Sequence, residues 1–137
     1  MGNATEVTSV AAGNRRQYLR VMPDADAPVR VDINGADFIE VIEAVDISED
    51  GIGITVTHQF AGCDVNRPAS FIVYLPMPIN RYFRVEGRIM HVRGDSFGVR
   101  FTNLNDKSRE LLREYIAMWL RKRSAWDYIR YMLHMLR

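Results

Sequence analysis

The chain contains a single cysteine, Cys63, and this scarcity excludes several classes of protein. One thiol cannot close an intramolecular disulfide, which excludes a disulfide-stapled secreted domain and favours a reducing compartment. His58, His91 and His134 are scattered, with no partner at ligand spacing. We therefore expect Cys63 to be a small hydrophobe near a loop, and we expect no metal site.

Long apolar segments and a strong net charge are absent as well. The apolar runs are far shorter than the ~20 residues that a membrane-spanning helix needs, and the N-terminus has no apolar region of the signal-peptide kind. Lysine and arginine total 18 against 17 aspartates and glutamates, so the formal net charge is +1. No global field favours duplex nucleic acid or an anionic membrane. The sequence predicts a cytoplasmic protein that neither inserts into membranes nor binds duplex nucleic acid.

The chain does contain a series of short segments with the pattern of β-strands. Residues 29–33 alternate between apolar and polar, as in a half-buried strand, and the following Asn34-Gly35 is typical of a tight hairpin turn. Gly53 weakens a later strand and predicts a bulge or a close backbone approach there. The predicted strands are residues 27–34, 38–45, 51–57, 70–75, 83–92 and 96–103. Their spacing and their Gly/Pro turns predict one domain, a small antiparallel barrel.

Two helical segments follow the strands. Asn105 or Asp106 can cap the first helix. Its apolar stripe consists of Leu112, Ile116, Trp119 and Leu120. Ser124 to Asp127 resemble a capping box, which predicts a second helix. The residues that this helix is expected to bury are Ile129, Met132, Leu133 and Leu136. No Gly or Pro enforces a break, so one bent helix is the alternative.

Several large apolar residues can be interpreted in two ways. They are Met90, Met118, Met132, Met135, Trp119 and Trp126. Methionine packs well into irregular space, so we expect these side chains to fill the core rather than to form a partner-binding groove. A barrel this small has little surface for two apolar helices. The alternative is therefore that one helix is buried against a second copy of the chain or another protein.

Three arginines lie close together before the first predicted strand, in the segment Asn14-Arg15-Arg16-Gln17-Tyr18-Leu19-Arg20. A guanidinium is a planar, permanently charged fork that suits phosphate oxygens and the O6/N7 edge of guanine. Taken alone, Arg-x-x-x-Arg is equally typical of a solvated tail or helix face.

A second polar segment, Asp46-Ile47-Ser48-Glu49-Asp50-Gly51, follows the second predicted strand. Asp46 offers an acceptor and Ser48 a hydroxyl, which suit the N–H edge of guanine and a ribose. Asp-x-Ser-x-x-Gly alone is typical of a turn, since Asp and Ser bond their own backbone and Gly supplies positive φ. Both segments in this order are much less frequent by chance, and together they predict an anionic guanine nucleotide as the ligand.

Arg-x-x-x-Arg followed by Asp-x-Ser-x-x-Gly resembles the PilZ domain, the bacterial receptor module for cyclic di-GMP. Residues 85–92 and 98–104 look like the last two strands of a PilZ barrel, and a helix follows where the family has one. The resemblance covers residues 15 to about 120. It implies a mainly β fold, a small six-stranded antiparallel PilZ-type barrel with one or two C-terminal helices, and it implies a binding protein rather than an enzyme.

The resemblance also implies the roles of particular residues. Arg15, Arg16 and Arg20 would hold phosphates and guanine edges. Asp46 and Ser48 would read a guanine, and Gly51 would let the backbone approach. An arginine at the position of Arg15 is typical of PilZ proteins that take an intercalated pair of ligands, so we expect two cyclic di-GMP molecules per chain, with no other cofactor.

The implied organisation is a flexible tail over residues 1–14, a PilZ domain over 15–123 and an additional helix over 124–137. Residues 1–20 have little apolar content, so we expect them to be mobile when free and ordered by ligand, which would signal to a protein partner. Catalysis is not expected, because no nucleophile has a base beside it.

Two alternatives use the same barrel differently. In the first, the barrel is a degenerate scaffold that binds no ligand and acts through self-association or docking of its helices. In the second, it binds single-stranded nucleic acid through aromatic residues that lie near arginines. Those residues are Tyr18, Tyr82 and Phe83, near Arg16, Arg81 and Arg84.

Overall fold

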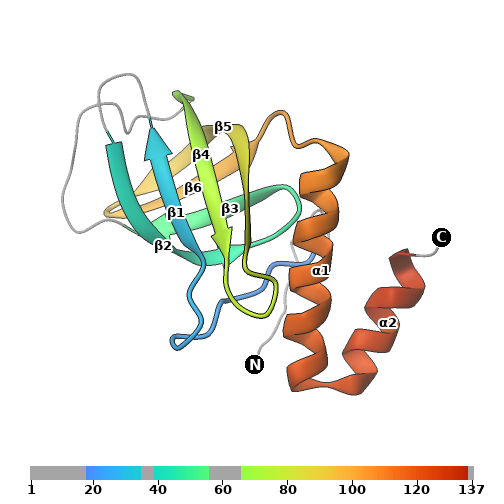
Figure 1. Cartoon of the computed structure of the whole chain (residues 1–137). Helices are drawn as coiled ribbons and strands as arrows, with labels where there is room; N and C mark the ends of the chain where they lie inside the picture. The colour runs from blue at the N-terminus through green and yellow to red at the C-terminus, as the bar shows by residue number, and fades with distance from the viewer. Residues whose placement is uncertain (1–17, 35–38, 56–65, 136–137) are drawn as a thin grey trace.

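The computed structural model describes residues 18–34, 39–55 and 66–135, which form a closed antiparallel barrel of six strands followed by two helices (Figure 1). The strands are β1 (Arg30–Asn34), β2 (Ile39–Ile47), β3 (Gly51–Thr55), β4 (Pro68–Leu75), β5 (Arg81–Arg93) and β6 (Ser96–Phe101). The helices are α1 (Asp106–Arg123) and α2 (Ala125–Met135). The strand order around the barrel is β1-β2-β3-β6-β5-β4, and β4 pairs back to β1. The predicted fold class is confirmed.

One apolar core fills the barrel and continues under α1. Alternate residues point inward, so that Val31 and Ile33 of β1 are buried while Arg30 is exposed. Leu112 and Ile116 of α1 are buried in the same cluster, as the predicted apolar stripe requires. Each such side chain contributes about 1.5–3 kcal/mol when it is fully buried. The helix α1 is therefore part of the folded unit.

The ends of the helices agree with the predicted caps. Asn105 caps α1, since its side chain accepts a hydrogen bond of 2.8 Å from the Ser108 N–H. Ser124 has an extended backbone, with φ −155° and ψ 113°, and its Oγ accepts from the Asp127 N–H at 3.2 Å. The C-terminal segment is thus two helices, and Ser124 ends one and caps the next. Within the part of the chain that the structure describes, neither helix is long and apolar enough to cross a membrane.

The predicted buried face of α2 is wrong. None of the described residues of this helix is fully buried, and Ile129, Met132 and Leu133 are exposed, while Leu136 lies outside the described residues. Tyr128 and Tyr131 are the residues of α2 that pack against the core cluster. The reason is that α1 already covers the barrel, so α2 packs mainly on the outer side of α1 (Figure 1). Tyrosine suits that half-covered position, because its ring packs while its hydroxyl reaches polar groups.

The interpretation of the large apolar residues as core is correct only in part. Met118 and Trp119 are partly buried against the core. Met90, Met132 and Trp126 are exposed, with Trp126 exposed to 65%. These three side chains are not core fillers in the free chain. The expectations for Cys63, His58 and the N-terminal tail concern positions outside the described residues.

Candidate functional site

The structure brings the arginine segment and the Asp-x-Ser segment together on the barrel surface. Arg20 Nη1 donates to Asp46 Oδ1 at 2.5 Å, and both side chains are partly exposed. The next residue, Val21, is held beside Ile47, since each N–H donates to the other residue's C=O at 3.0 and 2.9 Å. Two segments that are 26 residues apart in the chain therefore meet as an ion pair. Arg15 and Arg16 lie outside the described residues.

Ser48 and Gly51 form the tight turn between β2 and β3. The Ser48 N–H donates to the Gly51 C=O at 3.0 Å. The Ser48 hydroxyl is buried and donates to the side-chain carboxylate of Asp50. The backbone N–H of Asp50 donates in turn to Ser48 Oγ at 3.2 Å. Ser48, Asp50 and Gly51 are therefore engaged with one another within the turn.

At two positions of this site, Gly51 and Gly53, neighbouring atoms lie so close to the backbone that a side chain would clash with them. A Cβ on Gly51 would lie 2.1 Å from the carbonyl oxygen of Val99, so the approach that Gly51 permits is to the backbone of β6. A Cβ on Gly53 would lie 2.9 Å from Asp46 Oδ1. The register of β2 against β3 also shifts between Ala44 and Asp46. The close approach predicted at Gly53 is confirmed, and the Asp46 carboxylate occupies the space that a side chain there would need.

Glu49 is a further residue of this region that the sequence motifs did not single out, although it lies inside the Asp-x-Ser-x-x-Gly segment. Only 5% of Glu49 is exposed. Its Oε1 accepts from Arg113 Nε at 2.9 Å and lies 3.6 Å from Arg109 Nη1, while its Oε2 accepts from the Tyr131 hydroxyl at 3.4 Å. In the sequence, Arg109 and Arg113 stand at i and i+4 and so share one face of a helix, but this spacing does not show which carboxylate they meet.

The surroundings of the Tyr131 hydroxyl shift its pKa. Burial raises the pKa of Tyr131 far above the usual value for tyrosine, and the negative charge of Glu49 raises it further. The nearby Arg113 acts in the opposite direction. Tyr131 is therefore a neutral hydrogen-bond donor to Glu49 over the physiological pH range.

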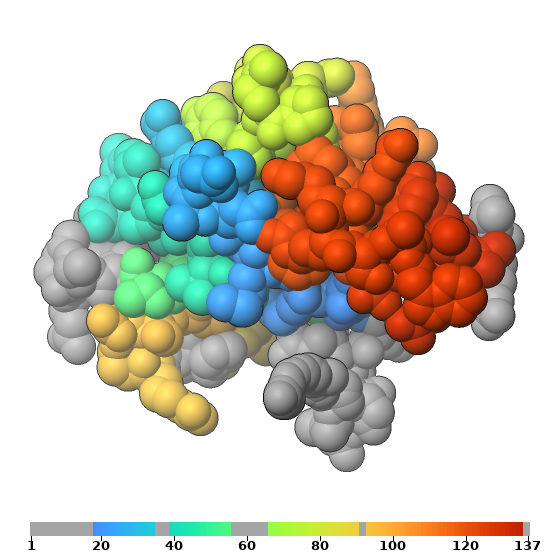
Figure 2. Space-filling view, turned by 90° about the horizontal axis from the view of Figure 1, so that it is seen from below, coloured from blue at the N-terminus to red at the C-terminus, as the bar shows by residue number. Residues whose placement is uncertain are grey.

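The same helix α1 also holds the segment that follows Arg20. Trp119 Nε1 donates to the Met22 carbonyl at 2.8 Å. Arg123 pairs with the Asp24 carboxylate and lies over the Trp119 ring at 3.7 Å from its centroid, and Lys122 lies 3.7 Å from Asp24. Figure 2 shows this blue segment lying against the orange and red helices. Both polar segments of the site are thus attached to α1.

The chemistry of the site favours an anionic ligand with a polar edge. Arg20 presents a fork of donors, and its buried Nε has no hydrogen-bond partner among the described residues. Asp46 lies next to it as an acceptor. A guanidinium beside a carboxylate can bind phosphate or guanine O6/N7 with one group and guanine N–H with the other. Over the described ranges, no cluster of three groups suited to a metal ion occurs.

The aromatic residues give little support for binding of single-stranded nucleic acid. Tyr82 is exposed and lies 5.6 Å from the Tyr74 ring. Phe83 is only 5% exposed and belongs to the barrel core, so it cannot stack on a base. The part of that alternative that used Phe83 is wrong.

Comparison with known proteins gives a consistent result. The family model of the PilZ domain matches residues 14–118, whereas no curated protein matches the chain. The inhibitor of motility MotI/DgrA of Bacillus subtilis has a similar fold, with a TM-score of 0.64 and 21% identity over 80% of this chain and 54% of that one. The chain thus spans about half the length of that protein.

Two further solved structures carry a ligand. The PilZ domain of YcgR from Escherichia coli with c-di-GMP has a TM-score of 0.64 and 18% identity over 79% of this chain and 92% of that one. The MrkH–c-di-GMP complex from K. pneumonia has a TM-score of 0.66 and 11% identity over 80% of this chain and 54% of that one. Identities this low show a shared fold. Together with the family match over most of its length, they show that this chain belongs to the PilZ domain family.

Proposed function

We propose that this chain is a receptor for cyclic di-GMP that acts on a protein partner and carries out no reaction of its own. The observation that supports this most directly is the Arg20–Asp46 pair, which joins the two polar segments on one surface. Family membership and the ligand-bound structures of YcgR and MrkH agree with it. The proposed binding residues are Arg15, Arg16, Arg20, Asp46, Ser48 and Gly51.

Each group has a role that follows from its chemistry. The arginines hold phosphates and the O6/N7 edge of guanine, because a guanidinium makes two parallel charge-assisted bonds. Asp46 accepts from guanine N–H groups, and the Ser48 hydroxyl adds a donor or an acceptor. Gly51 shapes the turn by letting β3 approach β6 closely. The ligand replaces the Arg20–Asp46 ion pair with bonds of its own.

Isothermal titration of the full chain with cyclic di-GMP tests the proposal. Arg20→Ala and Asp46→Ala should each weaken binding at least about tenfold, since a charge-assisted hydrogen bond contributes about 1.5–3 kcal/mol. Arg20→Lys should not restore affinity, because the fork is lost.

Arg30→Ala is the matched control for this titration. Arg30 also pairs with an aspartate, Asp32 at 3.0 Å, but on the outer face of β1. Its loss should leave the affinity unchanged. Wild-type affinity in both Arg20→Ala and Asp46→Ala would contradict the proposed site. If the wild-type chain shows no binding of cyclic di-GMP, the receptor function is rejected.

A second candidate function is supported by the exposed face of α2. Trp126, Ile129 and Leu133 are exposed at i, i+3 and i+7, so they share one side of the helix. A ligand-independent scaffold that associates through this stripe would bind no cyclic di-GMP and would sediment as an oligomer. Leu133→Lys should then give monomers, which analytical ultracentrifugation can measure.

A further inference from the structure

Glu49 stands at the junction of three parts of the molecule. It belongs to the turn between β2 and β3, it pairs with two arginines of α1, and it accepts a hydrogen bond from Tyr131 of α2. We propose that Glu49 is a positioning residue that couples the ligand turn to α2, so that cyclic di-GMP releases α2 from the turn. This inference rests on the proposed function.

Burial makes this junction specific. Glu49 is almost fully enclosed, and a buried carboxylate is stable only when it is paired and hydrogen-bonded. Arg113 and Arg109 supply the charge, and Tyr131 supplies a neutral donor. The turn therefore cannot move without changing at least one of these contacts. The Tyr131 bond, at 3.4 Å, is the longer of the two hydrogen bonds to Glu49 and should open first.

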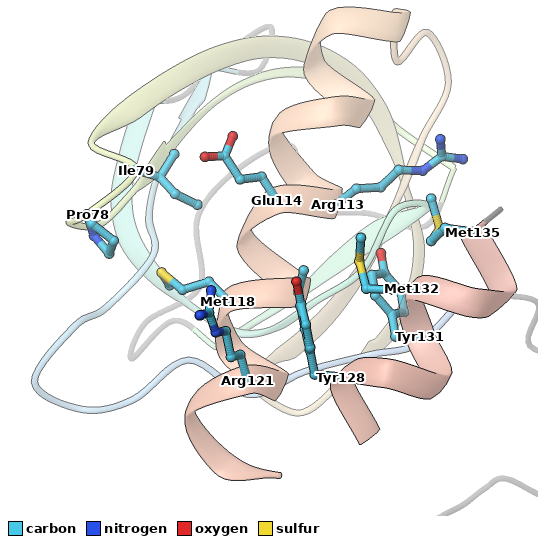
Figure 3. A pocket seen from close by; sticks show the side chains of 11 residues that line it. Pro78, Ile79, Arg113, Glu114, Met118, Arg121, Tyr128, Tyr131, Met132 and Met135 are labelled. Carbon is cyan, nitrogen blue, oxygen red and sulfur yellow. The ribbon is translucent and has the colours of Figure 1, made fainter. Parts of the chain in front are cut away.

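Tyr131 also lines a groove formed by α1, α2 and the loop before β5. Figure 3 shows side chains from α1, from α2 and from the loop before β5 arranged around this groove, which has a volume of about 490 Å³. Its lining includes Ile79, Met118, Tyr128, Tyr131 and Met132. Because Tyr131 contacts Glu49 and also forms part of the groove wall, a change in its position alters the groove.

Ligand binding opposes the free arrangement of the turn. Asp46 is occupied by Arg20, and the Ser48 hydroxyl is occupied by Asp50. A nucleotide that takes Asp46 Oδ1 and the hydroxyl hydrogen of Ser48 must break both contacts, and Glu49 lies between Ser48 and Asp50 in the same turn. The arrangement of the turn that contacts Tyr131 and the arrangement that binds ligand are therefore mutually exclusive. By linkage, weakening the contact to Tyr131 must strengthen ligand binding.

The test compares two tyrosines of the same helix in the full-length chain. Tyr131→Phe removes the hydroxyl that bonds Glu49 and keeps the ring. Tyr128→Phe is the matched control, because Tyr128 is also partly buried and no hydrogen bond joins it to the turn. Tyr131→Phe should tighten cyclic di-GMP binding about threefold, the effect of one net hydrogen bond. Tyr128→Phe should leave binding unchanged.

Hydrogen exchange gives the second readout. Cyclic di-GMP should speed the exchange of amides of α2 in the wild type and in Tyr128→Phe, while in Tyr131→Phe these amides should exchange fast already without ligand. A merely structural role for the hydroxyl predicts weaker binding in Tyr131→Phe, so the sign separates the two explanations.

Three results would overturn the inference. Unchanged or weaker binding in Tyr131→Phe would do so, and so would protection of α2 that ligand does not alter in the wild type. In both cases the wild-type chain still binds ligand, and the proposed function stands. A wild-type chain that binds no cyclic di-GMP would overturn the proposed function and this inference together.

Discussion

At the scale of single residues, the position of one carboxylate decides the chemistry of the site. Asp46 is held from one side by Arg20 and lies across the bare backbone of Gly53 on the neighbouring strand. Neither Arg20 nor Gly53 alone fixes the position of this carboxylate, because Asp46 needs both an ion-pair partner and the space left by the missing side chain of Gly53. Gly53 is thus part of the proposed binding site, although it offers no polar side chain.

Substitution of Gly53 should separate binding from folding. In Gly53→Ala the new methyl group lies within 3.1 Å of the Asp46 carboxylate, which must move aside, so cyclic di-GMP binding should weaken at least about tenfold through the loss of a charge-assisted bond. The fold should be kept, because the displaced group is the end of a side chain. Titration calorimetry and thermal unfolding measure the two effects.

Gly94→Ala provides the opposite control. Gly94 has a φ of +63° and an open space for a Cβ, so alanine there strains the backbone without touching the site. We expect about 1 kcal/mol lower stability and unchanged affinity. Wild-type affinity in Gly53→Ala would show that the position of Asp46 does not matter for the ligand.

The two sequence motifs predicted that Arg20 and Asp46 serve one site, and the structure brings these side chains together. The glycine inside a strand pattern predicted the close approach at Gly53. The sequence could not identify the partners of Glu49. A carboxylate within a turn motif is typical of solvated acids, and only the packing of α1 and α2 shows which arginines and which tyrosine face it. Long-range pairing of this kind leaves almost no trace in a single sequence.

At the scale of elements, α1 contacts both polar segments of the site. Its first half holds Glu49 through Arg109 and Arg113, and its second half holds the segment after Arg20 through Trp119 and Arg123. Between these contacts, Tyr115 is fully buried in the core. The packing of this helix should therefore control both the stability of the barrel and the arrangement of the site.

Tyr115 makes the stability of this packing depend on alkaline pH. Burial, with a further contribution from Asp24, raises the pKa of Tyr115 to about 12 from an unperturbed 10.0. The folded state thus favours the neutral phenol. The associated free energy of unfolding is fully present below pH 10, and about 2–3 kcal/mol of it should be lost as the pH rises from 10 to 12.

Chemical denaturation between pH 9 and 12 measures this loss. Tyr115→Phe has no phenol to ionise and should lose less stability over the same range, with the remaining loss coming in part from Tyr131, whose pKa is shifted in the same direction. Equal pH dependence in wild type and Tyr115→Phe would show that Tyr115 does not control it.

The second helix shows why periodicity predicted the wrong face. Ile, Leu and Met of α2 form a regular stripe, and hydrophobicity alone places such a stripe inward. The inward positions belong instead to Tyr128 and Tyr131. This helix packs on a surface that includes the polar Glu49 carboxylate, and it does not enter the apolar core. The start of the helix was predictable, since the cap at Ser124 is a local interaction.

At the scale of the whole molecule, Arg20–Asp46 is the one ion pair of the proposed site among the described residues, and we expect the second ligand of the pair to depend on Arg15. A third guanidinium can stack on a guanine face and bond a phosphate at once. We expect native mass spectrometry to show two cyclic di-GMP molecules per chain. Arg15→Leu should shift the population from two towards one, and a wild-type chain that saturates with a single ligand would contradict the expectation.

The expected ordering of the N-terminal segment by ligand needs one restriction. Val21 is buried and paired with Ile47 in the free chain, and Trp119 holds the Met22 carbonyl. The amide of Val21 should therefore be protected from exchange with and without ligand. Any ordering that ligand produces must concern residues before Arg20.

The closure of the sheet has a consequence for how such a chain can be reused. In the described barrel every strand pairs with a neighbour on both sides over at least part of its length, so the sheet has no edge strand of the kind to which another chain commonly adds a strand. Tandem copies or fusions to unrelated domains can therefore be placed next to this barrel without inviting intermolecular sheet growth. The fold is portable, and contacts with neighbouring domains fall to helices and side chains.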